Sequence, residues 1–259
     1  LPHHISPVLE VLDDVRTECP NARCWSISDS AAHRFVPIET RSPQLGDTTI
    51  PTGYGYGGVA LTAVLRRLQA TNQRLRKLVV IDFSEDVFIS AVNDGASVAT
   101  SSALTPLSGV SAAPGHEVPE ADMFALYLEQ TGQSPEAGVR ACYDTLGLYA
   151  AADTTDPQLV AKAWHAGASA TKRAFARLRY SVRSHLAAYA TYLGELDGVV
   201  LTGSVLEEND SWRRRLLEDL PLFSITLDHD RNQSCINTEG TITKTESTPV
   251  LVVKNDELR

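Results

Sequence analysis

Two apolar segments followed by an Asp94-Gly95 dipeptide limit the possible folds of this chain more than any other feature. Residues 77–92 read KLVVIDFSEDVFISAV, in which two apolar runs of β type are separated by Ser84-Glu85-Asp86. Asp-Gly readily supplies the two positive-φ positions of a two-residue hairpin turn. The pattern therefore predicts a β-hairpin at the centre of a sheet.

The segment that follows the turn, within Asn93–Val110, is rich in small and hydroxylated residues. Pro106 and Gly109 disfavour a long helix there, because proline lacks a backbone donor and glycine favours turns. Composition leaves two interpretations open. The segment is either an ordinary polar loop that closes a hairpin or a wall that presents hydroxyl and backbone groups to a ligand.

The charge of the chain excludes some classes of partner. Its formal net charge is -9 at pH 7, whereas nucleic acids and anionic membranes are bound by basic surfaces. We therefore expect neither as a partner. The basic residues within Lys172–Arg183 alternate with apolar residues at helical spacing, which predicts the solvated side of a helix.

The cysteines and the apolar runs indicate the compartment. Cys19, Cys24, Cys142 and Cys235 are too few and too scattered for a disulfide framework, so we expect a reducing compartment and a cytoplasmic location. No apolar run approaches the ~18 residues of a membrane-spanning helix. The chain begins at Leu1 without a signal-peptide pattern, from which we expect a processed or partial chain.

Apolar periodicity predicts alternating helices and strands along the chain. The predicted helices are Pro7–Glu18, Val59–Gln73, Val118–Gln130, Pro135–Leu146 and one long helix over Pro157–Leu193. The predicted strands are Arg23–Ile27, Lys77–Phe83, Asp197–Gly203, Phe223–Leu227 and Pro249–Val253. A last helix is expected to begin at Asn255. This alternation indicates an α/β fold with a mixed sheet.

Asp29 is the first candidate functional acid. It follows the predicted strand Arg23–Ile27, and residues just past strand ends face the ligand crevice of an open α/β sheet. The alternative is that Asp29 is the N-cap of a turn that begins at Ser30. The glycine-rich run Gly53–Gly58 is weak evidence for a phosphate loop, because no Lys-Ser/Thr pair follows it.

Four motifs in order resemble the acetate kinase family, which includes propionate and butyrate kinases. SVATSSALTPLSGV resembles the family's Ser-Val-Asp-Thr-Ser-Met-Gly-Phe-Thr-Pro-Leu-Glu-Gly-Leu, and WSISDSAAH resembles Val-Phe-Asp-Thr-Ala-Phe-His. VVLTGSVLEEN is similar to Phe-Thr-Gly-Gly-Ile-Gly-Glu-Asn, and VVKNDEL is similar to Pro-Thr-Asn-Glu-Glu-Leu. The likeness runs from Leu1 to Arg259, and it implies the actin-like ATPase fold of actin, hsp70 and sugar kinases.

The resemblance implies a division of the chain and a reaction. Residues 1–36 would be a remnant of the first lobe, 37–254 the second, nucleotide-side lobe, and 255–259 the start of a truncated C-terminal helix. The family chain begins with a further block that has no counterpart here. The implied reaction uses ATP and Mg2+ to phosphorylate acetate or another short-chain carboxylate, which gives acetyl phosphate in the case of acetate.

Site residues carry over from the family position by position. Asp29 falls on the catalytic aspartate, and Asp256 falls on an acid that helps to hold magnesium. The nucleotide-binding positions are Thr100, Thr105, Gly109, Gly203 and Asn209. Asp256 has an alternative role as an acid at a helix N-terminus, where the helix dipole favours it.

The phosphate-binding motifs depart from the family pattern. Tyr-Gly-Phe-His-Gly becomes YGYGG, so Gly57 stands where the family has a histidine, and the loop His-Leu-Gly-Asn-Gly-Ala-Ser becomes DFSEDVF over residues 82–88. A polyphosphate ~4 Å from one carboxylate meets a repulsion of about 1 to 4 kcal/mol per unit-charge pair. We therefore expect phosphate binding of the family type to fail at this loop.

Other charged or close-packing groups of the family are replaced as well. Pro114–Val118 stands where the family has Thr-Arg-Ser-Gly-Asp, and Ala152–Asp156 stands where it has Ser-Asp-Met-Arg-Asp. His116 carries part of a positive charge or is simply a solvated loop residue, and it lacks the two-pronged geometry of an arginine. Leu206 and Glu207 fall where glycines would let the backbone approach a nucleoside.

These observations together predict an acetate kinase-like phosphotransferase that is impaired or inactive as this chain. The alternative is a catalytically dead family member that serves as a dimerisation or small-molecule-binding module. The resemblance implies a homodimer formed through the second lobe, and the long helix from Pro157 carries enough apolar surface for this expectation.

Overall fold

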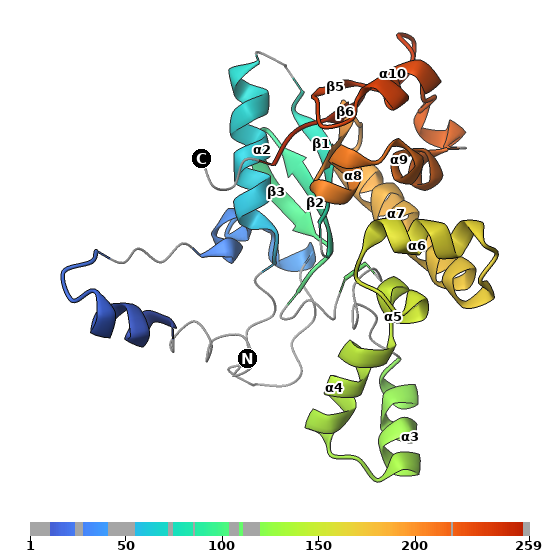
Figure 1. Ribbon diagram of the computed structural model, residues 1–259. Coiled ribbons are helices and arrows are strands. Elements are labelled where there is room, and N and C mark those ends of the chain that lie inside the picture. Colours follow the sequence, from blue (N-terminus) through green and yellow to red (C-terminus); the bar gives the residue numbers. More distant parts are fainter. Residues whose placement is uncertain are drawn as a thin grey trace.

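The computed structural model describes residues 11–23, 28–40, 55–71, 75–84, 86–103, 109–110, 120–218 and 220–255. They form a six-stranded mixed sheet in the order β3-β2-β1-β4-β6-β5, with helices on both faces (Figure 1). The strands are β1 (Lys77–Phe83), β2 (Val87–Asn93), β3 (Ala96–Thr100), β4 (Gly198–Thr202), β5 (Gly240–Thr241) and β6 (Val250–Val252). The predicted α/β class with a mixed sheet is confirmed.

The strand directions follow from the turns. β1, β2 and β3 are antiparallel neighbours, whereas β1, β4 and β6 run parallel to one another. The predicted Asp94-Gly95 turn is confirmed, with φ of 48° and 79° at its two residues. The hairpin was predicted at the centre of the sheet, and this position is wrong. The hairpin consists of β2 and the edge strand β3, whereas the central strands are β1 and β4.

The two faces of the sheet bury alternate residues of the same strands. Leu78 and Val80 of β1 pack with α2 (Gly58–Ala70) on one face. Val79 and Ile81 pack on the other face, where α7 (Ser169–Leu193) covers the sheet (Figure 1). Because both faces are covered, the central strands are apolar almost throughout, as expected for parallel strands.

The remaining helices surround this core. They are the 3-10 helices η1 (Asp29–His33), η2 (Ile38–Thr40) and η3 (Pro221–Phe223), and the α-helices α3 (Ala121–Thr131), α4 (Pro135–Thr145), α5 (Leu148–Ala152), α6 (Pro157–His165), α8 (Ser204–Glu208), α9 (Asp210–Leu217) and α10 (His229–Ser234). Residues 11–18 are also helical. The α3–α4 hairpin projects away from the sheet (Figure 1).

Two predicted elements are wrong, and in both cases a positive φ interrupts the apolar pattern. The long helix over Pro157–Leu193 is broken into α6 and α7 at Gly167, whose φ is 88°. The strand over Phe223–Leu227 is replaced by η3 and isolated bridges, since Ser224 has a φ of 52°. Most of the predicted strand Arg23–Ile27 lies outside the described residues. The same holds for nearly all of the predicted final helix.

The apolar side of α7 is used within the chain. Phe175, Leu178, Val182 and Leu186 are buried in the core against the sheet, while Tyr180 is exposed on the outer side. The apolar residues that suggested a dimer surface therefore face inward. In the described part of the chain, no helix combines the length and the apolar character needed to cross a bilayer.

Candidate functional site

Three segments meet where the parallel strands end. They are the β1–β2 turn, the β4–α8 turn and the segment that leaves β6. The backbone N–H of Ser204 donates to Ser84 Oγ at 3.4 Å, and the N–H of Asn255 donates to Glu207 Oε1 at 2.9 Å. Ligands of open α/β sheets bind in the crevice beyond the carboxyl ends of the strands. This meeting point is therefore the first candidate site.

Gly203 fixes the β4–α8 turn against β1. Its φ is 88°, and a Cβ at this position would lie 2.5 Å from Asp82 Oδ1 and from the carbonyl group of Phe83. A side chain is excluded both by the conformation and by this contact. The sequence-predicted nucleotide position Gly203 thus lies beside the end of β1.

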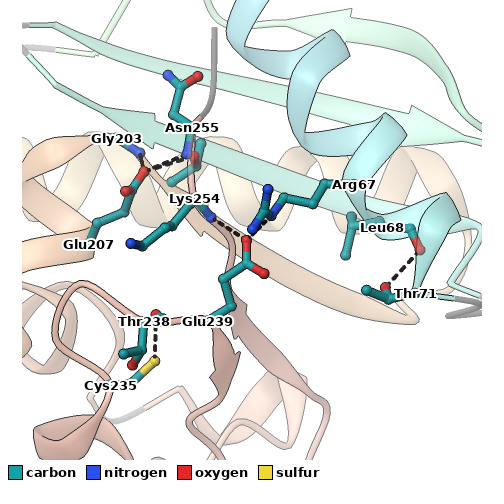
Figure 2. Close-up of polar contacts among 11 residues, drawn as sticks. Arg67, Leu68, Thr71, Gly203, Glu207, Cys235, Thr238, Glu239, Lys254 and Asn255 are labelled. Carbon is teal, nitrogen blue, oxygen red and sulfur yellow. Dashed lines mark hydrogen bonds and ion pairs between the residues drawn. The ribbon is translucent and has the colours of Figure 1, made fainter. Parts of the chain in front are cut away.

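Glu207 holds the turn and the last segment together. Its Oε1 accepts hydrogen bonds from the Gly203 N–H at 2.9 Å, the Asn255 N–H at 2.9 Å and the Thr202 hydroxyl at 3.3 Å. Figure 2 shows this carboxylate between Gly203 and Asn255. Sequence reasoning treated Glu207 only as a replacement of a glycine, and it missed this bridging role.

Hydrogen bonds of Asn209 and Arg213 stabilise the helices α8 and α9 that follow this turn. Asn209 Oδ1 accepts from the N–H groups of Ser211 and Trp212 at 3.1 and 3.2 Å, so this predicted nucleotide residue is the N-cap of α9. The fully buried Arg213 guanidinium donates to Leu206 O, and burial lowers its pKa. The guanidinium also donates to the side-chain and backbone oxygens of Asn232 and to the backbone oxygen of Glu207.

Asp29 organises a second part of the site at the start of α2. Its Oδ2 accepts from the Gly57 N–H and its Oδ1 from the Val59 N–H, both at 2.8 Å. A Cβ at Gly58 would lie 1.9 Å from Asp29 O, so only glycine fits there. Asp29 therefore caps α2, and not its own turn, whose N-cap position is Ser28.

His33 lies next to this loop, and sequence reasoning did not identify it. Its Nε2 is 3.1 Å from Tyr56 O and its Nδ1 is 2.8 Å from Ser97 Oγ. Because a carbonyl only accepts, Nε2 carries the proton, and the neutral Nδ1 accepts from the Ser97 hydroxyl. Burial lowers the pKa of His33, although the charge of Asp29 opposes this shift. Its only sequence signal is its place at the end of the WSISDSAAH motif.

Phe88 occupies the space beside Gly57. A Cβ at Gly57 would lie 2.8 Å from the Phe88 ring, and Gly57 itself has a φ of 74°. Phe88 also stacks on Tyr56, with ring centroids 6.3 Å apart. Position 57 therefore has neither the backbone conformation nor the room for a histidine side chain.

The predicted nucleotide residues fall into two groups. Thr100 lies with the Asp29 part, where its Oγ1 is 3.4 Å from Ser102 Oγ, which accepts from the Tyr56 N–H. Gly203 and Asn209 lie with the Glu207 part. The half-buried Gly109 shares no described contact with either group, and Thr105 and Asp256 lie outside the described residues.

Both parts of the site lie at one end of the sheet. Phe88, which packs on Gly57, is paired in register with Asp82, which lies beside Gly203. The β1–β2 turn between them is closed by the Ser84 N–H, which donates to Asp86 O at 3.2 Å. Asp82, Asp29 and Glu207 therefore place carboxyl groups at this end of the sheet, which we call the crevice.

The donor set limits how a metal ion could be held. Within the described ranges, no group of three or more His, Cys, Asp or Glu side chains is placed to hold a metal ion. Mg2+ usually takes only one or two protein carboxylates together with phosphate oxygens and water. The Oδ1 of Asp82 is buried beside Gly203, so a metal shared with phosphate oxygens would be held by the other carboxyl oxygen of this residue.

Comparisons with known sequences agree with the motif order. A model of the acetokinase family matches residues 1–258. An acetate kinase of Clavibacter michiganensis subsp. michiganensis is 28% identical over an alignment of 268 positions that covers 99% of this chain and 67% of the relative. A propionate kinase of Salmonella typhimurium strain LT2 is 26% identical over 86% of this chain and 63% of its own length.

Solved structures share the fold. Porphyromonas gingivalis acetate kinase superposes with a TM-score of 0.84 at 20% identity, over 96% of this chain and 65% of that protein. A propionate kinase from Francisella tularensis superposes with a TM-score of 0.86 at 22% identity, over the same shares of the two chains. The chain thus spans about two thirds of the length of these proteins.

Proposed function

The chain belongs to the acetokinase family, and we propose on this premise that it is the nucleotide-side lobe of a carboxylate kinase. It binds Mg-ATP weakly, and on its own it phosphorylates acetate or propionate far more slowly than a typical enzyme turns over. The observation that carries this proposal is the meeting of three family-like segments at Ser84, Gly203 and Asn255.

The residues of the crevice divide the work between two parts. Gly203 and Asn209 form one nucleotide wall, and Thr100, Thr105 and Gly109 are proposed to form the other. When bound, Mg-ATP supplies the phosphoryl group and the cation that neutralises its charge. Asp82 and Asp256 are proposed to share the metal, and Asp29 orients the acceptor through the loop that it holds at Gly57 and Val59.

We expect slow phosphoryl transfer because the described part of the crevice lacks positive charges and carries additional negative ones. Phosphoryl transfer depends on cationic and N–H groups placed around the transferring group. Phe88 fills the space that a histidine at position 57 would need, and the acidic residues of the loop DFSEDVF over 82–88 add negative charge. Repulsion falls most strongly on free ATP, so binding should require Mg2+.

Trapping of the acyl phosphate with hydroxylamine tests this proposal. With purified chain, Mg-ATP and acetate or propionate, we expect turnover below about 0.1 s-1, which is roughly 100-fold under the median enzyme. Reactions without carboxylate correct for ATP hydrolysis, and D29N should abolish any remaining turnover. Acyl phosphate formation near 10 s-1 would contradict the impairment proposed for this chain.

A ligand-binding module without catalysis is the second candidate. The packing of Phe88 on Gly57 favours it, because this contact keeps the loop well ordered while it excludes a catalytic side chain. Such a module would bind Mg-ADP and Mg-ATP alike and give no acyl phosphate.

We also propose that the chain divides into its lobes after residues 36 and 254, that it forms a homodimer and that it is cytoplasmic. The free thiols of Cys19, Cys142 and Cys235 agree with a reducing compartment.

A further inference from the structure

Two glutamates bind consecutive N–H groups of the segment that leaves β6. The Lys254 N–H donates to Glu239 Oε1 at 3.0 Å, and the Asn255 N–H donates to Glu207 Oε1 at 2.9 Å. Successive N–H groups of an extended chain point in opposite directions. Figure 2 shows the two carboxylates on either side of this segment, which we call the carboxylate clamp.

Each glutamate of the clamp is also tied to another element. Glu207 accepts from Gly203 in the β4–α8 turn. Glu239 forms an ion pair with Arg67 of α2, and both side chains are about one third exposed. The clamp therefore connects the last segment to the candidate nucleotide turn on one side and to α2 on the other.

The sheet alone does not place this segment. β6 ends at Val252, and the Val253 N–H still donates to Leu201 O at 2.9 Å. For Lys254 and Asn255, the backbone N–H partners that the structure describes are the two glutamate carboxylates. Hydrogen bonds to charged acceptors are stronger than those between neutral groups, so the two bonds can fix a segment that lies beyond the last strand pairing.

We propose that Glu207 and Glu239 are positioning residues that hold Lys254 and Asn255 against the β4–α8 turn, and that Mg-nucleotide binding requires this placement. The inference rests on the proposed function, because it assigns the clamp to the same crevice. Neither carboxylate needs to contact the nucleotide. Glu207 makes the larger contribution, since it alone joins the segment directly to Gly203.

Conservative and truncating variants separate position from charge. E207A removes the acceptor, whereas E207Q keeps an oxygen that accepts from Gly203 and Asn255. We expect E207A to weaken Mg-ATP binding by tenfold or more in calorimetric titrations, and E239A to weaken it by about threefold. E207Q should bind within threefold of the wild type. The matched control is E208A, because the adjacent Glu208 is exposed, and it should change nothing.

Amide hydrogen exchange of the full chain provides a readout that does not depend on nucleotide. E207A should accelerate exchange at Gly203 and Asn255, and E239A should accelerate it at Lys254, with exchange of the central strand β1 unchanged. Unaltered exchange in both variants would overturn the clamp. Wild-type affinity in E207A would overturn the positioning role even if Asn255 exchanged faster.

The wild-type titration separates this inference from the proposed function. If the wild type binds Mg-ATP and E207A binds it equally well, the inference fails and the proposed function stands. If the wild type itself does not bind Mg-ATP, the proposed function fails first, and the positioning role falls with it.

Discussion

Asp29 and Glu207 organise the two parts of the crevice in different ways. Asp29 receives N–H groups from Gly57 and Val59, which lie 28 and 30 residues further along the chain. Glu207 receives the Gly203 N–H four residues before it, together with the distant Asn255 N–H. Both carboxylates order backbone around the crevice, and neither adds the positive charge that phosphoryl transfer requires.

The two parts also differ in what lies behind them. The Glu207 part rests on Arg213, a buried cation bound to carbonyl and amide oxygens. The Asp29 part rests on the neutral His33 and on the Phe88 ring. Both parts are therefore held by buried hydrogen bonds, but a buried cation lies behind one part and a neutral imidazole with an aromatic ring lies behind the other.

Removal of the Arg213 side chain should disrupt the Glu207 part, and it should lower the free energy of unfolding more than the substitutions in the Asp29 part do. R213A strands several buried oxygens and leaves a cavity, so we expect a loss of about 3 kcal/mol or more in the free energy of unfolding. Urea denaturation measures it. R213K, which retains the charge but not the planar fork, should fall between R213A and the wild type. R214A, with a half-exposed side chain, should cost less than about 0.5 kcal/mol.

Placing a histidine at position 57 should break the Asp29 part. G57H forces a side chain into a positive φ and against Phe88, and overpacking of this kind costs about 1 to 3 kcal/mol. The same histidine combined with F88A should recover part of that loss, because the ring no longer fills the space. Equal stabilities of the single and double variants in urea would show that Phe88 does not exclude the side chain.

The buried His33 should make the stability of the chain depend on pH. Its folded pKa lies below the unfolded value of 6.5, so the unfolded chain binds the proton first. Stability should therefore fall as pH drops below 6.5 towards the folded pKa, by at most about 1.4 kcal/mol per pH unit. H33Q should flatten this slope in urea midpoints at pH 7.5, 6.5 and 5.5.

His185 requires a matched control in that experiment. Burial also lowers the pKa of His185, which lies on α7 and is 2.9 Å from Ser181 O through Nδ1. H185Q should remove a separate share of the same slope. A wild-type slope that survives in both H33Q and H185Q would contradict the assignment to buried histidines.

The sequence predicted the central sheet well because its signal is local. The apolar run Lys77–Phe83 has the bounds of β1, and Asp197–Gly203 exceeds β4 by one residue at each end. Both strands are buried on both faces, so their composition alone identifies them. The break at Gly167 could not be read in the same way, because its flanking sequences keep helical spacing on both sides.

The motifs nominated positions for the site but gave no information on their contacts. The motifs placed Asp29 and Gly203 at strand ends, and the structure puts both at one end of the sheet. Asp29 binds the N–H of Gly57, which is 28 residues away in the sequence. Glu207 binds the N–H of Asn255, whose position is set by the path of the chain after β6. Such long-range contacts have no periodic signature. His33 was missed for the same reason, since its partners Tyr56 and Ser97 are remote in sequence.

Calorimetric titration of ATP into the purified chain, with and without excess Mg2+, tests the central claim most directly. An ordered but acidic crevice should bind Mg-ATP in the micromolar to low millimolar range and give no heat of binding with free ATP at several millimolar. Absence of Mg-ATP binding at several millimolar would contradict the claim that the nucleotide scaffold is intact. Equal binding of free ATP would contradict the claim that its inner surface repels phosphate.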